Sequence, residues 1–183
     1  TWKKHVKTKT TRPAAEQGPA VNAQEQQILN QISAKMAERD SEEARSLCYQ
    51  ALEQSEDSTI KAEIERILGQ LNIRAIQRPE MTPDKIEYVV AAGDSLERIA
   101  KKFGTTVELI RQSNALQRDT IHPGDRLRIF NANLSIEVSK SRNDLVLKAN
   151  DVFLKRYRVG TGQYGKTPVG TFMIADKIKD PPW

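Results

Sequence analysis

The sequence contains few of the residues from which disulfides, metal sites and membrane spans are built. One cysteine and two histidines among 183 residues leave no pair for an intramolecular disulfide and no Cys/His ligand set for zinc. We therefore expect no metal and no cofactor. Aromatic residues make up only 5% of the chain, and no long apolar run is present. Because 38% of the residues are hydrophobic and 29% are charged, the composition excludes a membrane-embedded chain and a wholly disordered one, and it favours small modules.

One short basic segment at the start of the chain carries as many positive charges as the formal net charge of +5. Five basic residues precede the first acidic residue, Glu16: Lys3, Lys4, Lys7, Lys9 and Arg12. Residues 1–22 also lack apolar periodicity, so we predict a disordered basic linker there and place any export signal outside this chain. Since aromatic residues are sparse and are not interleaved with a basic face, nucleic acid is not an expected partner.

Residues 23–76 change abruptly to Gln, Glu, Ala, Leu and Ile, with apolar residues at helical spacing. We predict three helices with breaks near Asp40 and Asp57, and Asp40 followed by Glu43 fits the start of a helix. Three sets of apolar residues mark the helices: Ile28, Leu29, Ile32 and Met36; Ala44, Leu47, Cys48, Ala51 and Leu52; and Ile60, Ile64, Ile67, Leu68 and Leu71.

Part of this helical module resembles the second helix of a tetratricopeptide repeat. The residues concerned are Glu42, Ala44, Leu47, Tyr49, Ala51 and Leu52. Only one such unit is visible, and stacked repeats need several units to bury their faces. A helical hairpin that packs on itself or on a neighbour is therefore the favoured alternative, and a protein partner for this module stays open. Cys48 lies at core spacing with no nearby histidine, so we predict a small buried hydrophobic residue rather than a nucleophile.

A second module is predicted after a linker over residues 77–86. Pro79 and Pro83 interrupt helix within that run of mixed charge. Residues 87–130 then show the order strand, helix, helix, strand. Gly93 permits a tight turn between the first strand and the first helix.

Two helix starts are predicted inside this second module. Asp94 with Glu97 three residues later, and Thr105 with Glu108, both fit a capping pattern that satisfies free amide groups of the first turn. Asn114 is predicted to close the second helix. Two capped helices within so few residues indicate a helical hairpin.

Residues 87–130 resemble the lysin motif (LysM), and the resemblance covers the whole motif. It rests on Tyr88, Val90, Gly93, Asp94, Leu96, Ile99, Ala100, Phe103, Gly104, Leu109, Asn114, Leu116, Ile121, Pro123, Gly124, Leu127 and Ile129. Such modules bind polymers that contain N-acetylglucosamine, peptidoglycan or chitin, in a shallow groove between two loops. The resemblance places that groove at Gly93, Asp94, Ser95 and Leu96 on one side, and at Asn114, Ala115, Leu116, Gln117 and Ile121 on the other.

Independent chemistry favours such a ligand at this place. An N-acetyl sugar presents an amide donor and acceptor beside a methyl group, which suits backbone groups exposed at a glycine turn with a small apolar wall. The alternative is that Gly93, Asp94, Asn114 and Gly124 serve turn and cap geometry alone. The chain departs from many LysM sequences at Ala91, Ala92 and Glu97, which bears on sugar affinity rather than on fold.

Residues 131–183 are predicted to be mostly β. Three short strands are expected around Leu134 to Val138, Leu145 to Leu147 and Val152 to Val159, and an extended segment over residues 167–174 follows a glycine-rich loop. This part resembles the opening of the L,D-transpeptidase catalytic domain. The residues concerned are Val159, Gly160, Thr161, Gly162, Thr167, Pro168, Val169, Gly170, Thr171, Phe172, Lys179, Asp180, Pro181, Pro182 and Trp183.

The resemblance implies acyl transfer on peptidoglycan. In that family a cysteine thiolate in a Ser/Thr-His-Gly-Cys run attacks a peptide stem, a histidine acts as base, and the amine of a second stem resolves the acyl-enzyme into a cross-link. No cysteine or histidine follows His122, so we assign no catalytic residue and expect the 183 residues to be inactive on their own. Gly162, Gly165, Pro168 and Gly170 are interpreted as backbone-geometry positions.

The sequence thus predicts an α+β, multi-module chain in the cell envelope, either periplasmic or otherwise extracytoplasmic, with peptidoglycan as partner. The first hypothesis is the N-terminal portion of an L,D-transpeptidase whose catalytic Cys and His lie outside this chain. The alternative is a non-catalytic LysM adaptor. The two differ in whether a Cys with a nearby His occurs beyond Trp183.

Overall fold

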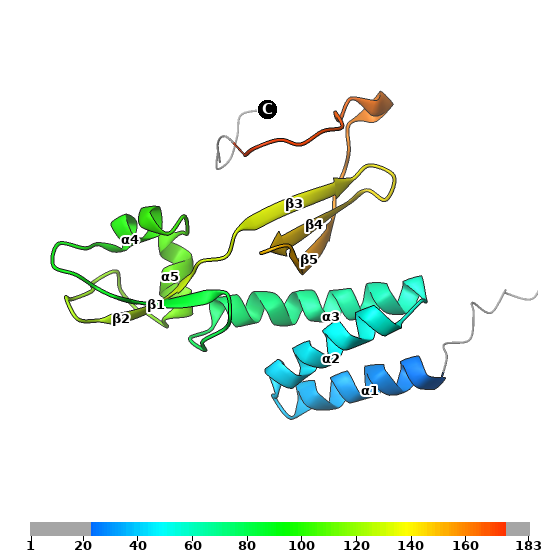
Figure 1. Cartoon of the computed structure of the whole chain (residues 1–183), viewed down its shortest axis with the longest axis horizontal. Helices are drawn as coiled ribbons and strands as arrows, with labels where there is room; N and C mark the ends of the chain where they lie inside the picture. The colour runs from blue at the N-terminus through cyan, green and yellow to red at the C-terminus, as the bar shows by residue number, and fades with distance from the viewer. Residues whose placement is uncertain (1–22, 175–183) are drawn as a thin grey trace, which may run out of the picture.

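The computed structural model describes residues 23–174 and has the predicted α+β architecture. Three helices, a four-element unit and a three-stranded sheet follow one another along the chain (Figure 1). The predictions for the basic linker (residues 1–22) and for the end from Lys179 to Trp183 lie outside the described residues. Within the described part, no helix is both long and apolar enough to cross a membrane.

The three predicted helices are present: α1 (Ala23–Ala37), α2 (Ser41–Gln54) and α3 (Ser58–Gln77). The predicted breaks are N-caps, because the Asp40 carboxylate accepts from the Glu43 amide and the Asp57 carboxylate accepts from two amides of α3. The three helices share one apolar core: Ile32, Ala44, Cys48, Ala51, Ile60, Ile64, Ile67, Leu68 and Leu71. Cys48 is fully buried in it, as predicted.

The second unit has the predicted order β1 (Lys85–Val89), α4 (Leu96–Lys102), α5 (Val107–Ser113) and β2 (Arg126–Phe130). The strands are antiparallel with Ile86 opposite Ile129, and β1 begins inside the range predicted as linker. The unit has a separate core: Val90, Leu96, Ile99, Ala100, Ile110, Leu127 and Ile129.

Both helix starts in this unit lie one residue later than predicted. The N-caps are Ser95 and Thr106, because the predicted residues have other partners. Asp94 accepts from the Tyr88 hydroxyl and from a backbone amide of the preceding turn. The Thr105 amide donates to the Ala100 carbonyl and completes the C-terminal cap of α4. Asn114 closes α5 as predicted.

The third unit is an antiparallel sheet in the order β3 (Leu134–Ser139), β4 (Asp144–Ala149), β5 (Val152–Arg158). A β-bulge interrupts the β4–β5 register between Leu147 and Lys148. Residues 167–174, predicted as extended, form no strand in the described part of the chain. A short 3-10 turn, η1 (Gln163–Gly165), lies in the glycine-rich loop before them.

Helix α3 joins the three units. α1 and α2 lie on one side of it, and the sheet stands on the other side with β5 nearest to α3 (Figure 1). The buried Asn72 side chain donates to the carbonyls of Phe153 and Leu154, which covers the free edge of β5. About one turn further along α3, at its C-terminal end, the buried Lys85 ammonium donates to the carbonyls of Ala75, Arg78 and Glu80. The helix therefore holds both β units by hydrogen bonds.

Candidate functional site

The first loop of the predicted groove, between β1 and α4, turns at Gly93. This residue has a φ of +84°, a left-handed conformation that side chains with a Cβ rarely adopt. The loop is fixed from both sides. The Arg98 guanidinium donates to the Gly93 carbonyl at 2.7 Å, and the Asp94 carboxylate accepts from the Ala91 amide at 2.8 Å. Gly93 itself is exposed, so its backbone is open to a ligand.

Asp94 also joins this loop to an aromatic pair below it. Its carboxylate accepts from the Tyr88 hydroxyl at 2.7 Å, and the Tyr88 ring meets Phe103 edge to face with centroids 5.3 Å apart. The Lys102 ammonium lies 4.5 Å from the centre of the Tyr88 ring. Hydrogen bonds from the Ala91 amide and the Tyr88 hydroxyl lower the pKa of Asp94 below its ordinary value. The carboxylate is therefore a fixed anion that organises the loop.

The second loop, after α5, is held by Asn114. Its amide group donates to the carbonyls of Ile110 and Arg128, and its oxygen accepts from the Arg128 amide at 2.7 Å. The side chain thus bridges α5 and β2 with all these groups engaged. Ala115 follows with a φ of +51°, and the amides of Ala115 and Leu116 cap the last turn of α5. A position that usually requires glycine is occupied here by alanine, which strains the loop at the predicted groove.

The structure divides the nine predicted groove residues into three groups. Gly93, Ala115 and Gln117 are exposed and free to face a ligand. Leu116 and Ile121 are half-buried on the same apolar core that holds the buried Leu96. The third group makes turn and cap hydrogen bonds with its side chains: Asp94, Ser95 and Asn114. The bonds of Asp94 and Asn114 fit the interpretation as turn and cap geometry, and ligand contact stays a prediction for all nine residues.

Sequence reasoning did not single out two basic residues beside the first loop. Arg98 donates to Gly93 from one turn into α4, and Lys102 lies one turn further against Tyr88. Their spacing of four residues places both on one side of the helix, which is the signal that could have found them. The spacing does not predict that Arg98 contacts the Gly93 carbonyl or that Lys102 contacts the Tyr88 ring.

The loop at the end of the described chain is organised by hydrogen bonds to the β3–β4 turn. The Gly162 amide donates to the Thr167 hydroxyl at 2.7 Å, and the Thr161 hydroxyl donates to the Asn143 side chain at 3.0 Å. The Lys140 ammonium donates to the Thr167 carbonyl. A Cβ at Gly162 would lie 3.2 Å from Thr167 Oγ1, so a larger residue would need the loop to shift by a few tenths of an ångström, which agrees with the backbone-geometry interpretation.

Two consecutive matches to family models decide what these two units resemble. The model of the LysM domain matches residues 88–130. The model of the L,D-transpeptidase catalytic domain follows and matches residues 133–183. The resemblances of these two units to LysM and to the L,D-transpeptidase catalytic domain are thereby confirmed.

The LysM domain is also the part that curated relatives share. The N-acetylmuramoyl-L-alanine amidase sle1 of Staphylococcus epidermidis strain RP62A is 50% identical over 42 residues, which are 23% of this chain and 13% of the relative. The cell wall-binding protein YocH of Bacillus subtilis strain 168 is 42% identical over 50 residues, or 27% of this chain and 17% of the relative. The chain thus spans under a fifth of these relatives' lengths. No solved structure matches it significantly.

The single cysteine of the chain lies outside the transpeptidase match. Cys48 lies in the helical core, where burial raises the pKa of its thiol to about 11, so a thiolate is strongly disfavoured at neutral pH. Among residues 23–174, no cluster of His, Cys, Asp and Glu side chains is arranged to hold a metal ion.

Proposed function

We propose that this chain is the peptidoglycan-binding portion of a cell-wall L,D-transpeptidase. In this proposal the LysM domain holds N-acetylglucosamine-containing glycan, and the transpeptidase domain acts on the peptide stems through a catalytic Cys and His beyond Trp183. The observation that carries it is the succession of the two family matches, with only residues 131 and 132 between them. A glycan-binding domain joined directly to a stem-modifying domain keeps both on the same polymer.

Contacts between the units support this arrangement. Ser113 at the end of α5 donates to the Ile76 carbonyl of α3, and the Asn131 amide donates to the Asp84 carbonyl. The Asn150 side chain, at the β4–β5 turn, donates to the Asp84 carboxylate. The start of the transpeptidase domain is therefore oriented by the LysM domain and by α3, rather than joined to them by a free linker.

The proposal places the protein outside the cytoplasm, in the cell envelope, where peptidoglycan is found. The names of the relatives, a cell wall-binding protein and a muramoyl-alanine amidase, agree with that location. A non-catalytic LysM adaptor is the second candidate, in keeping with the name of the cell wall-binding protein YocH, to which the chain is similar over 50 residues. The reading frame beyond Trp183 separates them, because only an enzyme needs a His-Gly-Cys run there.

Glycan binding is tested by sedimentation of the chain with purified peptidoglycan. Wild-type protein is expected in the pellet. The variant Gly93→Gln puts a side chain on the exposed turn of the groove and should weaken binding about tenfold or more, which corresponds to about 1.4 kcal/mol.

Gly104→Gln is the matched control. Gly104 also has a positive φ, +64°, and a Cβ there would meet nothing within 4 Å, so both variants carry a similar backbone strain. Gly104 lies between α4 and α5, outside the predicted groove, and its variant should sediment like the wild type. Equal sedimentation of all three proteins would rule out the groove.

A further inference from the structure

A broad cleft with strongly basic walls lies between α3 and the sheet, outside the LysM groove. Its volume is about 910 Å³. Two cations line it from α3 and four from the turn and strands of the sheet: Lys61, Arg66, Arg142, Lys155, Arg156 and Arg158. The only acidic residues in its lining are Glu65 and Asp144. The walls therefore carry a formal charge of +4, that is, six positive against two negative.

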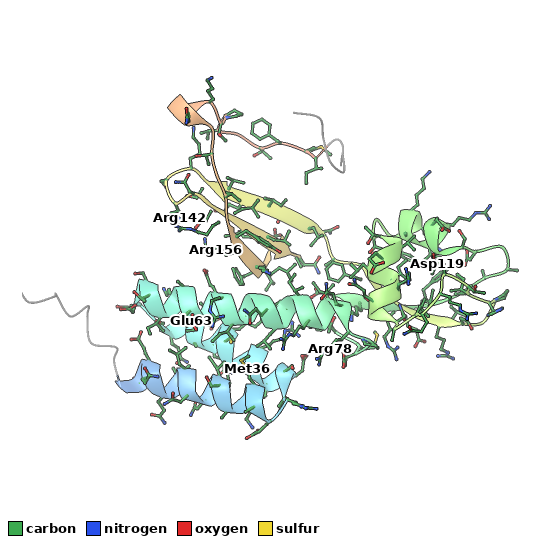
Figure 2. The ribbon with its side chains drawn as sticks, turned by 180° about the vertical axis from the view of Figure 1, so that it is seen from behind. Met36, Glu63, Arg78, Asp119, Arg142 and Arg156 are labelled. Atoms are coloured by element: carbon green, nitrogen blue, oxygen red, sulfur yellow. The ribbon has the colours of Figure 1, made fainter. Side chains whose placement is uncertain are left out.

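The acidic residues are already neutralised at the floor of the cleft. Arg156 donates to both oxygens of Glu65, at 2.6 and 2.8 Å, and to Asp144 at 2.6 Å. Arg142 donates to the same Asp144 oxygen. Figure 2 shows Arg142 and Arg156 on the sheet side of the cleft, above α3. These contacts hold the sheet to the helix and pair each carboxylate with a guanidinium group, while the second oxygen of Asp144 is buried away from the cleft surface without a hydrogen bond.

Three cations line the cleft without an ion pair in the described part of the chain: Lys61, Lys155 and Arg158. The alkyl chain of Lys155 packs over Gly69, where an added Cβ would lie only 3.1 Å from Lys155 Cγ. The Lys155 ammonium lies 4.9 Å from the centre of the Tyr157 ring. Because Gly69 leaves room for it, Lys155 is positioned by packing. Tyr157 is 40% exposed and offers an aromatic surface between the charges.

From this geometry we propose that the basic cleft binds the carboxylate groups of peptidoglycan peptide stems. The site would be separate from the LysM groove, and the proposal rests on the function proposed above. Cations without an ion pair supply charge-assisted hydrogen bonds to carboxylates, and the exposed Tyr157 ring beside Lys155 offers a surface for the apolar part of a peptide. The floor of the same cleft already pairs guanidinium groups with carboxylates.

The position of the cleft favours stems over other anionic polymers. Helix α3 runs from Lys61 in the cleft to Ile76 beside the LysM domain, about 20 Å at the rise of an α-helix. Glycan held by the LysM domain would therefore bring its own stems near the cleft at high local concentration. A phosphodiester polymer would use the same cations but would leave the Tyr157 surface without a matching group.

The test is calorimetric titration of the chain with a soluble free stem peptide, and with the same peptide after its carboxylates are converted to amides. We expect binding of the free peptide that weakens with salt, and about tenfold or more weaker binding of the amidated one. The triple variant Lys61→Gln, Lys155→Gln, Arg158→Gln should lose the difference between the two peptides. The triple variant Arg39→Gln, Arg74→Gln, Lys101→Gln removes the same charge at exposed positions outside the cleft and should behave like the wild type.

The outcomes separate this proposal from the one on which it rests. Gly93→Gln should still bind the free stem while losing glycan, so a failed groove and a failed cleft give different results. Equal affinity for free and amidated stems would overturn the cleft proposal. So would equal losses in the two triple variants, or binding of a soluble phosphodiester polymer without binding of stems. Should the cleft triple variant melt early, Lys61→Glu alone, on the surface of α3, repeats the test.

Discussion

The LysM domain and the β3–β5 sheet bury their apolar residues to very different extents. In the LysM domain, Ile99, Ile110 and Leu127 are almost completely buried. In β3, Leu134, Ile136 and Val138 are about half exposed although they alternate as regularly as a core strand. The same hydrophobic pattern therefore ends in a closed core in one unit and on an open face in the other.

The difference lies in what covers each sheet. The two strands of the LysM domain are closed over by α4 and α5 of the same unit, so the domain supplies its own core. The three-stranded sheet is covered mainly at one edge, where α3 meets β5. Its anchors are partly polar: Asn72 donates to two carbonyls, and Arg156 pairs with Glu65 and Asp144. A small apolar cluster at the end of α3 adds to them, formed by Ile76, Phe130, Ala149 and Leu154. The LysM domain should thus be stable by itself, whereas the sheet depends on the helical module.

The largest expected effect is the difference in the free energy of unfolding between two isoleucine-to-alanine variants, one in each unit. Ile99→Ala, at 1% exposure in the LysM core, should cost about 2–5 kcal/mol because it leaves a cavity. Ile136→Ala, at 47% exposure in β3, should cost less than about 1 kcal/mol. Urea unfolding of the two variants and the wild type gives both values. Equal losses would show that the face of β3 is covered in solution and would break the comparison.

A smaller effect is expected where the sheet is anchored on α3. Asn72 is 1% exposed and also contacts the Tyr49 hydroxyl. Asn72→Leu keeps the branched shape but removes the side-chain donor to the Leu154 carbonyl and the acceptor of Arg45 Nε, while the Phe153 carbonyl keeps the Tyr49 hydroxyl. We expect a cost of about 1–3 kcal/mol. Hydrogen exchange of the individual amides should show faster opening of β4 and β5, with the LysM amides unchanged.

The exposed Gln70 on the same helix provides the control for this anchor. Gln70→Leu should leave exchange in the sheet unchanged. If Asn72→Leu instead speeds exchange equally in the sheet and in the LysM domain, the two units unfold together, and the contrast between a self-contained domain and a dependent sheet is wrong.

Local sequence patterns predicted the helices and strands of this fold more accurately than they predicted the contacts between them. The three helices, both β units and their order follow from apolar spacing and from residues such as Asp40, Asp57 and Gly104. Both LysM helix starts were placed one residue too early, because Asp94 and Thr105 were engaged by Tyr88 and Ala100. At each helix start, two residues that can cap a helix are adjacent in sequence, and contacts with other parts of the domain determine which of them is the N-cap.

The candidate site was predictable in its backbone and not in its side-chain contacts. The turn at Gly93 and the helix end at Asn114 follow from their residue types. The burial of Leu96 and the contact of Arg98 with the Gly93 carbonyl depend on how the helix α4 packs. The basic cleft could not be predicted, because Lys61 and Arg158 are far apart in sequence and meet only through the packing of β5 on α3.

The smallest predicted effect is a loss of stability of the first LysM loop at acidic pH. Hydrogen bonds from Ala91 and Tyr88 lower the pKa of Asp94 below the ordinary value of 3.8. An acid whose pKa is lower in the folded state stabilises it above the unfolded pKa, and that stabilisation is lost as the pH falls through the folded pKa. The loop should therefore keep its full stability at neutral pH and weaken only below about pH 3.8.

A carboxyl NMR titration of Asp94 measures this directly. Its midpoint should lie below 3.8 in the wild type and rise toward that value in Tyr88→Phe, which removes one of the two donors to the carboxylate. Asp94→Asn should reduce the acid-induced loss of LysM stability, with Glu97, whose pKa is also lowered, contributing part of what remains, and it should leave the β3–β5 sheet unaffected. A wild-type midpoint at or above 3.8 would mean that the two hydrogen bonds do not hold the carboxylate in solution, and that the first loop of the groove is less rigid than the LysM core below it.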